Sequence, residues 1–128
     1  MPTVGENKLD GFLTPELSAL SSLRRLDVSG NAIGGRLVDL PPSLIFLDVE
    51  RNTMRGSPFE AIQNLSDLRQ LHLSSNAFTG DVPTQIGQLS SLEELWLANN
   101  QFGGSTLPSE VGYLTNLGTC GYYCLRFQ

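Results

Sequence analysis

The apolar residues of this chain recur in a fixed frame of about 24 residues. A five-residue motif, in which asparagine is followed at the third position by an apolar residue and at the fifth by glycine, begins at Asn7, Asn31, Asn52, Asn76 and Asn100. The steps between these asparagines are 24, 21, 24 and 24 residues. A period in this range predicts a stacked array of short structural units rather than a globule with one closed core.

Four further apolar positions precede the asparagine of each unit, at offsets of 11, 8, 5 and 3 residues. The four complete sets are Leu20, Leu23, Leu26 and Val28, then Pro41, Leu44, Leu47 and Val49, then Leu65, Leu68, Leu71 and Leu73, and then Leu89, Leu92, Leu95 and Leu97. The last two positions of each set are two residues apart, which is the alternation of a short strand with one face buried. We therefore predict parallel strands, one per unit, near residues 25–28, 46–49, 70–73, 94–97 and, more weakly, 119–122.

The remainder of each unit predicts a return leg on the opposite side. Proline begins the segments 83–86 and 108–111, which are expected to form single helical turns. The segment around Leu40-Pro41-Pro42 is expected to be extended, because proline disfavours helix at its own position and just before it.

The repeated asparagines have a structural explanation. The amide of each can donate and accept hydrogen bonds, so it can satisfy backbone groups of neighbouring turns that burial would otherwise strand. We predict a ladder of such side chains, formed by Asn31, Asn52, Asn76 and Asn100.

The complete pattern, L-x-x-L-x-x-L-x-L-x-x-N-x-L-x-G-x-x-P, resembles the leucine-rich repeat of the subclass first described in plants. The resemblance covers roughly residues 7–122, and the units at 65–88 and 89–113 lie closest to its consensus. It implies an α/β leucine-rich repeat solenoid, a right-handed β-α superhelix forming a horseshoe segment. A parallel β-sheet would line the concave face, and short helical or irregular turns would lie on the convex side.

The predicted organisation is one domain over residues 1–128. It has a partial repeat at 1–19, repeats at about 20–40, 41–64, 65–88 and 89–113, and a degenerate repeat at 114–128. The chain starts inside a repeat and shows no paired-cysteine cap of the kind found in many extracellular members of the family. Two interpretations follow: a fragment of a longer array, which we favour, or a small complete array with unrecognised caps.

Composition narrows the classes of partner. The 128 residues carry a net charge of −5, which disfavours nucleic acid as the main partner. The sequence has no apolar run of about 18 residues, so we expect no transmembrane segment in this chain, although the parent protein could be membrane-anchored.

The residues between the strand leucines are expected to point outward from the concave face. In one row these are Asp27, Asp48, His72 and Trp96. The neighbouring rows include Phe46, Arg69 and Glu94 on one side, and Ser29, Glu50 and Ser74 on the other. Exposed aromatic residues on a rigid sheet favour recognition of a protein or peptide, with Trp96 as the strongest candidate. The alternative is that these side chains only shield neighbouring strands.

His72 next to Asp48 could form a charge-assisted pair with a raised histidine pKa, or belong to a solvated polar row. A serine triad with Ser74 is disfavoured, because no nucleophile elbow accompanies it. As the only histidine, His72 cannot build a site with several histidine ligands. We therefore expect no catalytic residue, no cofactor and no metal.

Two local features remain open. Cys120 and Cys124 pair only if a turn brings them together, because four residues of extended chain hold their Cα atoms about 13 Å apart. The segment Asn64-Leu65-Ser66 matches the N-glycosylation sequon, a short motif with many false positives.

The expected function is a non-enzymatic scaffold for binding a protein or peptide, in recognition or signalling. The resemblance implies a location outside the cell or at its surface, as in receptor-like proteins and the ectodomains of receptor-like kinases. The alternatives are the sensing segment of a longer receptor-like kinase and a cytoplasmic adaptor.

Overall fold

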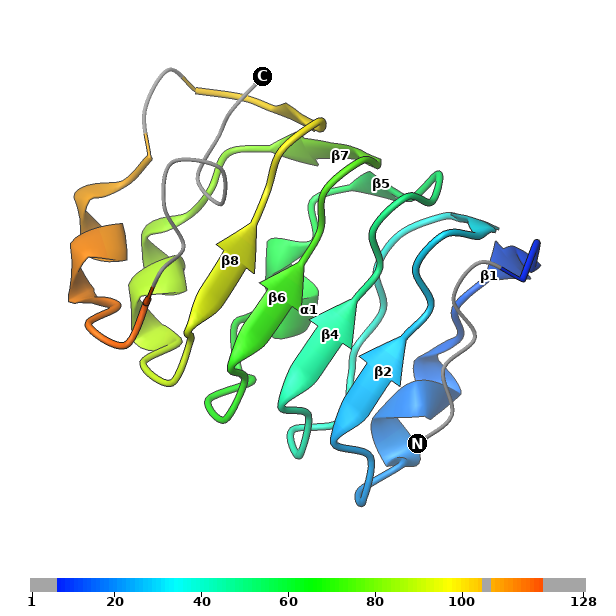
Figure 1. The fold of residues 1–128 in the computed structure, drawn as a ribbon, viewed down its shortest axis with the longest axis horizontal. Coiled ribbons are helices and arrows are strands. Elements are labelled where there is room, and N and C mark those ends of the chain that lie inside the picture. Colours follow the sequence, from blue (N-terminus) through cyan, green and yellow to red (C-terminus); the bar gives the residue numbers. More distant parts are fainter. Residues whose placement is uncertain (1–6, 105–106, 119–128) are drawn as a thin grey trace.

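The computed structural model describes residues 7–104 and 107–118 as a series of coils stacked side by side (Figure 1). Each of four consecutive coils contributes one strand to a parallel sheet in the order β2-β4-β6-β8. The strands are β2 (Arg25–Asp27), β4 (Phe46–Asp48), β6 (Gln70–His72) and β8 (Glu94–Trp96). The predicted α/β repeat solenoid and its first four strands are confirmed. The strand predicted near 119–122 and the two cysteines lie outside the described residues.

The register of this sheet follows from the leucine frame. Leu26, Leu47, Leu71 and Leu95 are paired along successive strands. The last three are fully buried, while Leu26, at the end of the stack, is half-buried. Because alternate residues of a strand point to opposite faces, the residues on either side of these leucines face outward. We call the outer side of β2, β4, β6 and β8 the sheet face.

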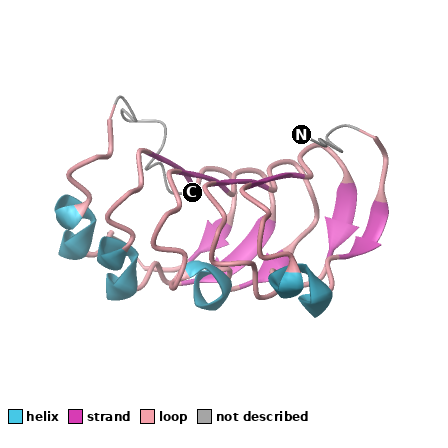
Figure 2. Ribbon diagram, turned by 90° about the horizontal axis from the view of Figure 1, so that it is seen from below, coloured by secondary structure: helices cyan, strands magenta, loops and turns pink. Residues whose placement is uncertain are grey.

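Short helices line the side opposite the sheet (Figure 2). They are η1 (Pro15–Ala19), α1 (Phe59–Ile62), η2 (Thr84–Gln88) and η3 (Ser109–Tyr113). The turns predicted after Pro83 and Pro108 are confirmed, as 3₁₀ helices with the proline directly before them. The proline-containing leg at residues 35–45 has no helix, as predicted.

A second set of strands was not predicted. Strand β1 (Asp10–Phe12) pairs with β3 (Ala32–Gly34), and β5 (Arg55–Gly56), β7 (Ala77–Gly80) and β9 (Gln101–Phe102) form a second row. These strands are also parallel, and paired residues are 22 positions apart, so the pairing is shifted by two residues from the 24-residue frame of these coils. The glycine that ends each five-residue motif lies in or beside them, with φ between +75° and +91° at all five positions. Such a backbone favours glycine.

The repeated asparagines lie in the turns that join the two sheets. Each Oδ1 accepts a hydrogen bond from a backbone N–H of the preceding coil: Leu9 to Asn31 at 2.8 Å, Ile33 to Asn52 at 3.0 Å, Met54 to Asn76 at 3.0 Å and Phe78 to Asn100 at 3.1 Å. Each Nδ2 donates to backbone oxygens of its own turn. Asn52 and Asn100 are buried, while Asn76 is half-buried.

Candidate functional site

The sheet face carries two complete rows of outward side chains. The first row runs through Arg25, Phe46, Gln70 and Glu94, and the second through Asp27, Asp48, His72 and Trp96. The neighbours in each row are paired residues of adjacent strands, and adjacent strands lie about 4.8 Å apart. Seven residues were predicted for this face; six of them belong to these rows and Arg69 directly precedes β6.

His72 holds the centre of the face. Its Nδ1 lies 3.5 Å from Asp48 Oδ2, and its Nε2 lies 2.9 Å from Glu94 Oε2. The second oxygen of Glu94 accepts a hydrogen bond from Gln70 Nε2 at 3.2 Å. The predicted contact with Asp48 is therefore present, but the shorter contact is to Glu94 in the other row.

The surroundings of His72 act on its pKa in opposite directions. Burial lowers the pKa, because an imidazolium loses hydration when it is enclosed. Hydrogen bonds to Asp48 and Glu94, with the nearby charges of Asp48 and Glu50, outweigh this effect and raise the pKa of His72 above its ordinary value of 6.5. The site is thus built to hold a positive charge between two carboxylates.

Aromatic rings flank the histidine on both sides. The His72 ring meets Phe46 edge-on, with centroids 5.4 Å apart and planes at 72°, and Trp96 at 5.5 Å and 56°. Trp96 is 38% exposed, so much of its ring is open to solvent. Phe46, His72 and Trp96 form a continuous row across three strands, which we call the aromatic row.

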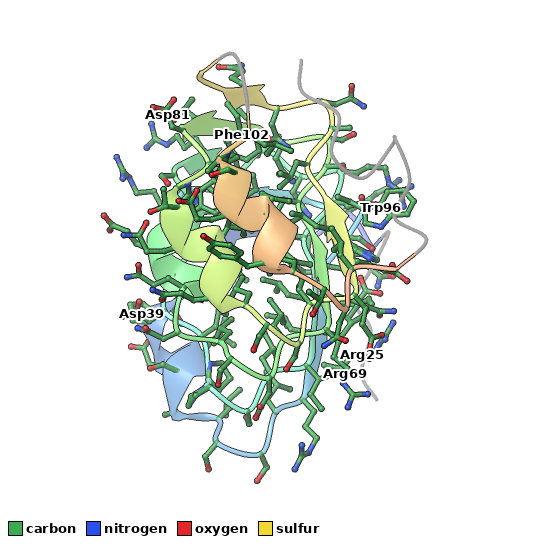
Figure 3. The ribbon with its side chains drawn as sticks, turned by 90° about the vertical axis from the view of Figure 1, so that its left-hand side faces the viewer. Arg25, Asp39, Arg69, Asp81, Trp96 and Phe102 are labelled. Atoms are coloured by element: carbon green, nitrogen blue, oxygen red, sulfur yellow. The ribbon has the colours of Figure 1, made fainter. Side chains whose placement is uncertain are left out.

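The edge of the sheet where the strands begin is basic. The Arg25 guanidinium carbon lies 3.6 Å from the centre of the Phe46 ring, which is the geometry of a cation–π contact. A shallow hollow of about 430 Å³ lies here, lined by Arg24, Arg25, Ile45, Phe46, Arg69, Gln70 and Glu93. Figure 3 shows Arg25 and Arg69 near this edge and Trp96 farther along, all on the same side of the molecule.

Asp27 bonds to the turn that follows its strand, as Asp48 also does through the Glu50 N–H at 2.9 Å. The Oδ1 of Asp27 accepts hydrogen bonds from the backbone N–H and the hydroxyl of Ser29, at 3.1 and 2.7 Å. It therefore stabilises the turn after β2, and it is not part of the cluster around His72.

The next outward position was interpreted incorrectly in part. Ser29 and Ser74 directly follow the second inward-facing residue of their strand segments, Val28 and Leu73. They were expected to be exposed, but they are only 9% and 7% exposed. Glu50, in the same position of the coil between them, is half-buried. The nitrogens of His72 face carboxylates, and the Ser74 hydroxyl has no hydrogen-bond partner in the described part of the chain. This geometry does not assemble a serine–histidine pair.

Residues 7–104 and 107–118 contain neither a candidate metal site nor a candidate membrane-spanning helix. No group of three or more histidine, cysteine or acidic residues could hold a metal ion there. No helix within these ranges is long and apolar enough to span a membrane. Asn64, the sequon residue, is exposed in the turn after α1, away from the four strands.

Comparison with protein families gives one consistent result. Three family models, each described as a leucine-rich repeat, match residues 19–36, 42–102 and 91–114. The comparison with curated proteins found no match.

Two of the similar solved structures are described as plant receptors. The leucine-rich repeat ectodomain of the membrane receptor kinase GASSHO1/SCHENGEN3 from Arabidopsis thaliana, in complex with CASPARIAN STRIP INTEGRITY FACTOR 2, is 33% identical with a TM-score of 0.80, over 89% of this chain and 14% of that chain. The plant peptide hormone receptor RGFR1 in complex with RGF2 is 34% identical with a TM-score of 0.82, over 86% of this chain and 18% of that one. The chain thus spans less than a fifth of the length of either receptor.

A shorter neighbour is covered more fully. The BIR3–SERK2 complex from Arabidopsis thaliana is 31% identical with a TM-score of 0.76, over 92% of this chain and 65% of that chain. Identity above 30% along most of this chain supports the same repeat type as well as the same fold.

Proposed function

The chain belongs to the leucine-rich repeat family, and we propose that it is a non-enzymatic segment that recognises a peptide or protein through the sheet face. Two of the structures it resembles are described as a receptor kinase ectodomain and a peptide hormone receptor, each in complex with a ligand. We extend that kind of activity to this chain as a proposal, because fold alone does not fix function.

The observation that carries the proposal is the aromatic row. His72 contacts Phe46 on one neighbouring strand and Trp96 on the other, and Trp96 is partly exposed. Aromatic side chains supply much of the binding energy in protein interfaces, because they bury a large area at a small cost in conformational entropy. The backbone beneath them is held by strand pairing, so little ordering opposes binding.

Charges around the aromatic row would orient the ligand. Arg25 and Arg69 lie toward the start of the strands, and Asp48 and Glu94 flank His72 farther along. An extended ligand lying across the four strands would meet a basic edge first and an acidic centre next. Charge patterns of this kind give specificity and faster association more than raw affinity.

The setting proposed for this segment is the cell surface or the extracellular space, as part of a receptor-like protein or the sensing part of a receptor-like kinase. The solved ectodomain of a plant membrane receptor kinase supports this setting. A cytoplasmic adaptor has no similar support among these structures.

Selection of ligands on the isolated chain tests the proposal. Random dodecapeptides displayed on phage would be selected against the chain, and the enriched peptides would be synthesised and titrated. Trp96→Ala should weaken their binding about thirtyfold, which corresponds to about 2 kcal/mol for a hot-spot aromatic residue. Thr84→Ala on η2, on the opposite side, is the control and should leave affinity unchanged. Peptides that ignore Trp96→Ala but lose affinity with Thr84→Ala would show that the wrong face was chosen.

A further inference from the structure

Beyond Trp96, at the edge where the strands end, the sheet face contains a second hollow. Its volume is about 280 Å³, and its lining residues are Glu50, Arg51, Ser74, Ser75, Trp96, Ala98 and Asn99. Sites for whole small molecules usually measure about 300–1,000 Å³, so this hollow suits one long side chain better than an independent ligand. We call it the Glu50 hollow.

The half-buried charge of the Glu50 hollow is acidic, while the basic Arg51 lies on its exposed rim. Glu50 is half-buried, and the Ser74 hydroxyl lies beside its carboxylate. Its backbone N–H donates to Asp48 Oδ1 at 2.9 Å, which holds a second carboxylate beside it. Burial and the neighbouring Asp48 charge raise the pKa of Glu50, and the Ser74 hydroxyl, His72 and Arg51 only partly offset them.

An orphaned hydroxyl lies in the same hollow. Ser74 is 7% exposed, and its Oγ has no hydrogen-bond partner among the described residues. Buried polar groups in folded proteins are nearly always hydrogen-bonded, so an unpartnered one that lines a hollow requires an explanation. The Ser74 Oγ is itself enclosed, so a cation bound at the Glu50 carboxylate could reach this oxygen only after the Ser74 side chain turns.

Trp96 supplies the wall of the hollow. Trp96 is 38% exposed, and the centroid of its ring lies 5.5 Å from that of the His72 ring. A cation within about 6 Å of a tryptophan ring is attracted by the negative face of the ring. Arg51, on the rim, is exposed, so its opposing charge is screened by solvent and salt, whereas Glu50 and Asp48 are half-buried and screened less.

We propose that the Glu50 hollow binds the cationic side chain of a lysine or arginine of the ligand. The Glu50 carboxylate accepts the charged N–H groups, and the Trp96 ring covers the aliphatic stem. The hollow is thereby assigned as a specificity subsite of the sheet face, and the inference rests on the proposed function for its biological setting.

The test uses small cations as probes. Because Trp96 is the only tryptophan of the chain, its fluorescence reports directly on the hollow. The protein would be titrated with n-butylguanidinium and n-butylammonium, with n-butanol as the neutral probe of similar shape. Amide chemical shifts would be recorded in the same titrations to locate the bound probe.

The cations should give a saturable change in fluorescence, with amide shifts centred on Glu50, Ser74 and Ala98, and n-butanol should give none. Glu50→Gln should weaken cation binding about tenfold, the loss expected for one charge-assisted hydrogen bond. Glu60→Gln on α1 is the matched control and should bind like the wild type.

Equal cation binding by the wild type and a folded Glu50→Gln variant would overturn the assignment, as would an equal response to n-butanol. The result is separable from that of the peptide selection. A chain that binds peptides through Trp96 but ignores both cations refutes this subsite alone. A chain that binds the cations at Glu50 but yields no peptide refutes the proposed function alone.

Discussion

Replacing Asn52 by alanine should destabilise the fold more than the loss of one small polar side chain normally does. Asn52 is 8% exposed, and its Oδ1 accepts a hydrogen bond from the Ile33 N–H at 3.0 Å. Its Nδ2 donates to the backbone oxygens of Val28, Val49 and Glu50, at 2.9, 3.0 and 3.2 Å. The Asn52 amide thus forms hydrogen bonds with the backbone of its own coil and of the preceding coil.

The backbone groups that bond to Asn52 differ in whether a second asparagine also bonds to them. The Val28 oxygen also accepts from Asn31 Nδ2 at 2.9 Å, and the Val49 oxygen also accepts from Asn76 Nδ2 at 2.8 Å. The Ile33 N–H instead depends on Asn52 Oδ1. A buried donor without a partner costs about 1–3 kcal/mol, and this stranded N–H therefore sets the expected loss for Asn52→Ala.

Urea unfolding followed by circular dichroism measures this loss, and thermal unfolding should show a fall in Tm of about 4 °C per kcal/mol for a chain of this size. Asn64→Ala is the matched control, because it removes the same atoms from an exposed turn and should change stability by at most about 0.5 kcal/mol. Asn52→Asp should be at least as harmful as Asn52→Ala at neutral pH, because a carboxylate oxygen would face backbone carbonyls. Equal urea midpoints for Asn52→Ala and Asn64→Ala would refute the reasoning.

Three further outcomes are expected. Since the pKa of His72 is raised on folding, its contribution to stability is complete below about pH 6.5 and is lost as the pH rises through the folded value. The stability advantage of the wild type over His72→Gln should therefore shrink as the pH rises above about 6.5, and a constant difference would contradict this. Gly87→Ala should cost about 1–3 kcal/mol, because its new Cβ would lie 2.7 Å from a backbone oxygen of η3, while Gly112→Ala meets nothing within 4 Å and should be neutral or slightly stabilising; equal melting temperatures would argue against this packing. After expression through a secretory pathway, Asn64 should carry a glycan that Asn64→Gln removes, as read by a mass shift after glycosidase treatment, and an unmodified wild-type chain would disprove this.

The period of the sequence was sufficient to predict the stacked coils and the main sheet. Leucines two residues apart in every coil define both the strand and its inward face, and the equal frame aligns Asp48, His72 and Trp96 on neighbouring strands. The second set of strands gave no comparable signal. Each has only two to four residues and includes or adjoins a glycine, so neither alternation nor β-propensity marks it.

The left-handed backbone conformation of the residue before each asparagine could also not be predicted from the sequence. Gly30, Arg51, Ser75 and Asn99 all have φ between +53° and +67°, although only Gly30 has the residue type that favours this region. The turn between the sheets imposes the conformation, and the surrounding hydrogen bonds maintain it. Ser75 is half-buried in this strained turn.

Side-chain detail at the site was only partly predictable. The rows follow from strand register, but the shorter contact of His72, to Glu94, crosses from one row to the other and depends on rotamers that the sequence does not specify. The burial of Ser74 has a similar origin, because the chain turns away from the sheet after His72 and carries the next outward position under the loop. The Glu50 hollow, which Ser74 lines, could therefore not be predicted from the sequence.

Hydrogen–deuterium exchange on the chain, with and without a peptide obtained by the selection above, is the most direct test of the central claim that ligands bind the sheet face. Binding should protect β4, β6 and β8, at residues 46–48, 70–72 and 94–96, and leave exchange in α1 and η2, at residues 59–62 and 84–88, unchanged. Protection confined to α1 and η2, with the three strands unaffected, would contradict the account.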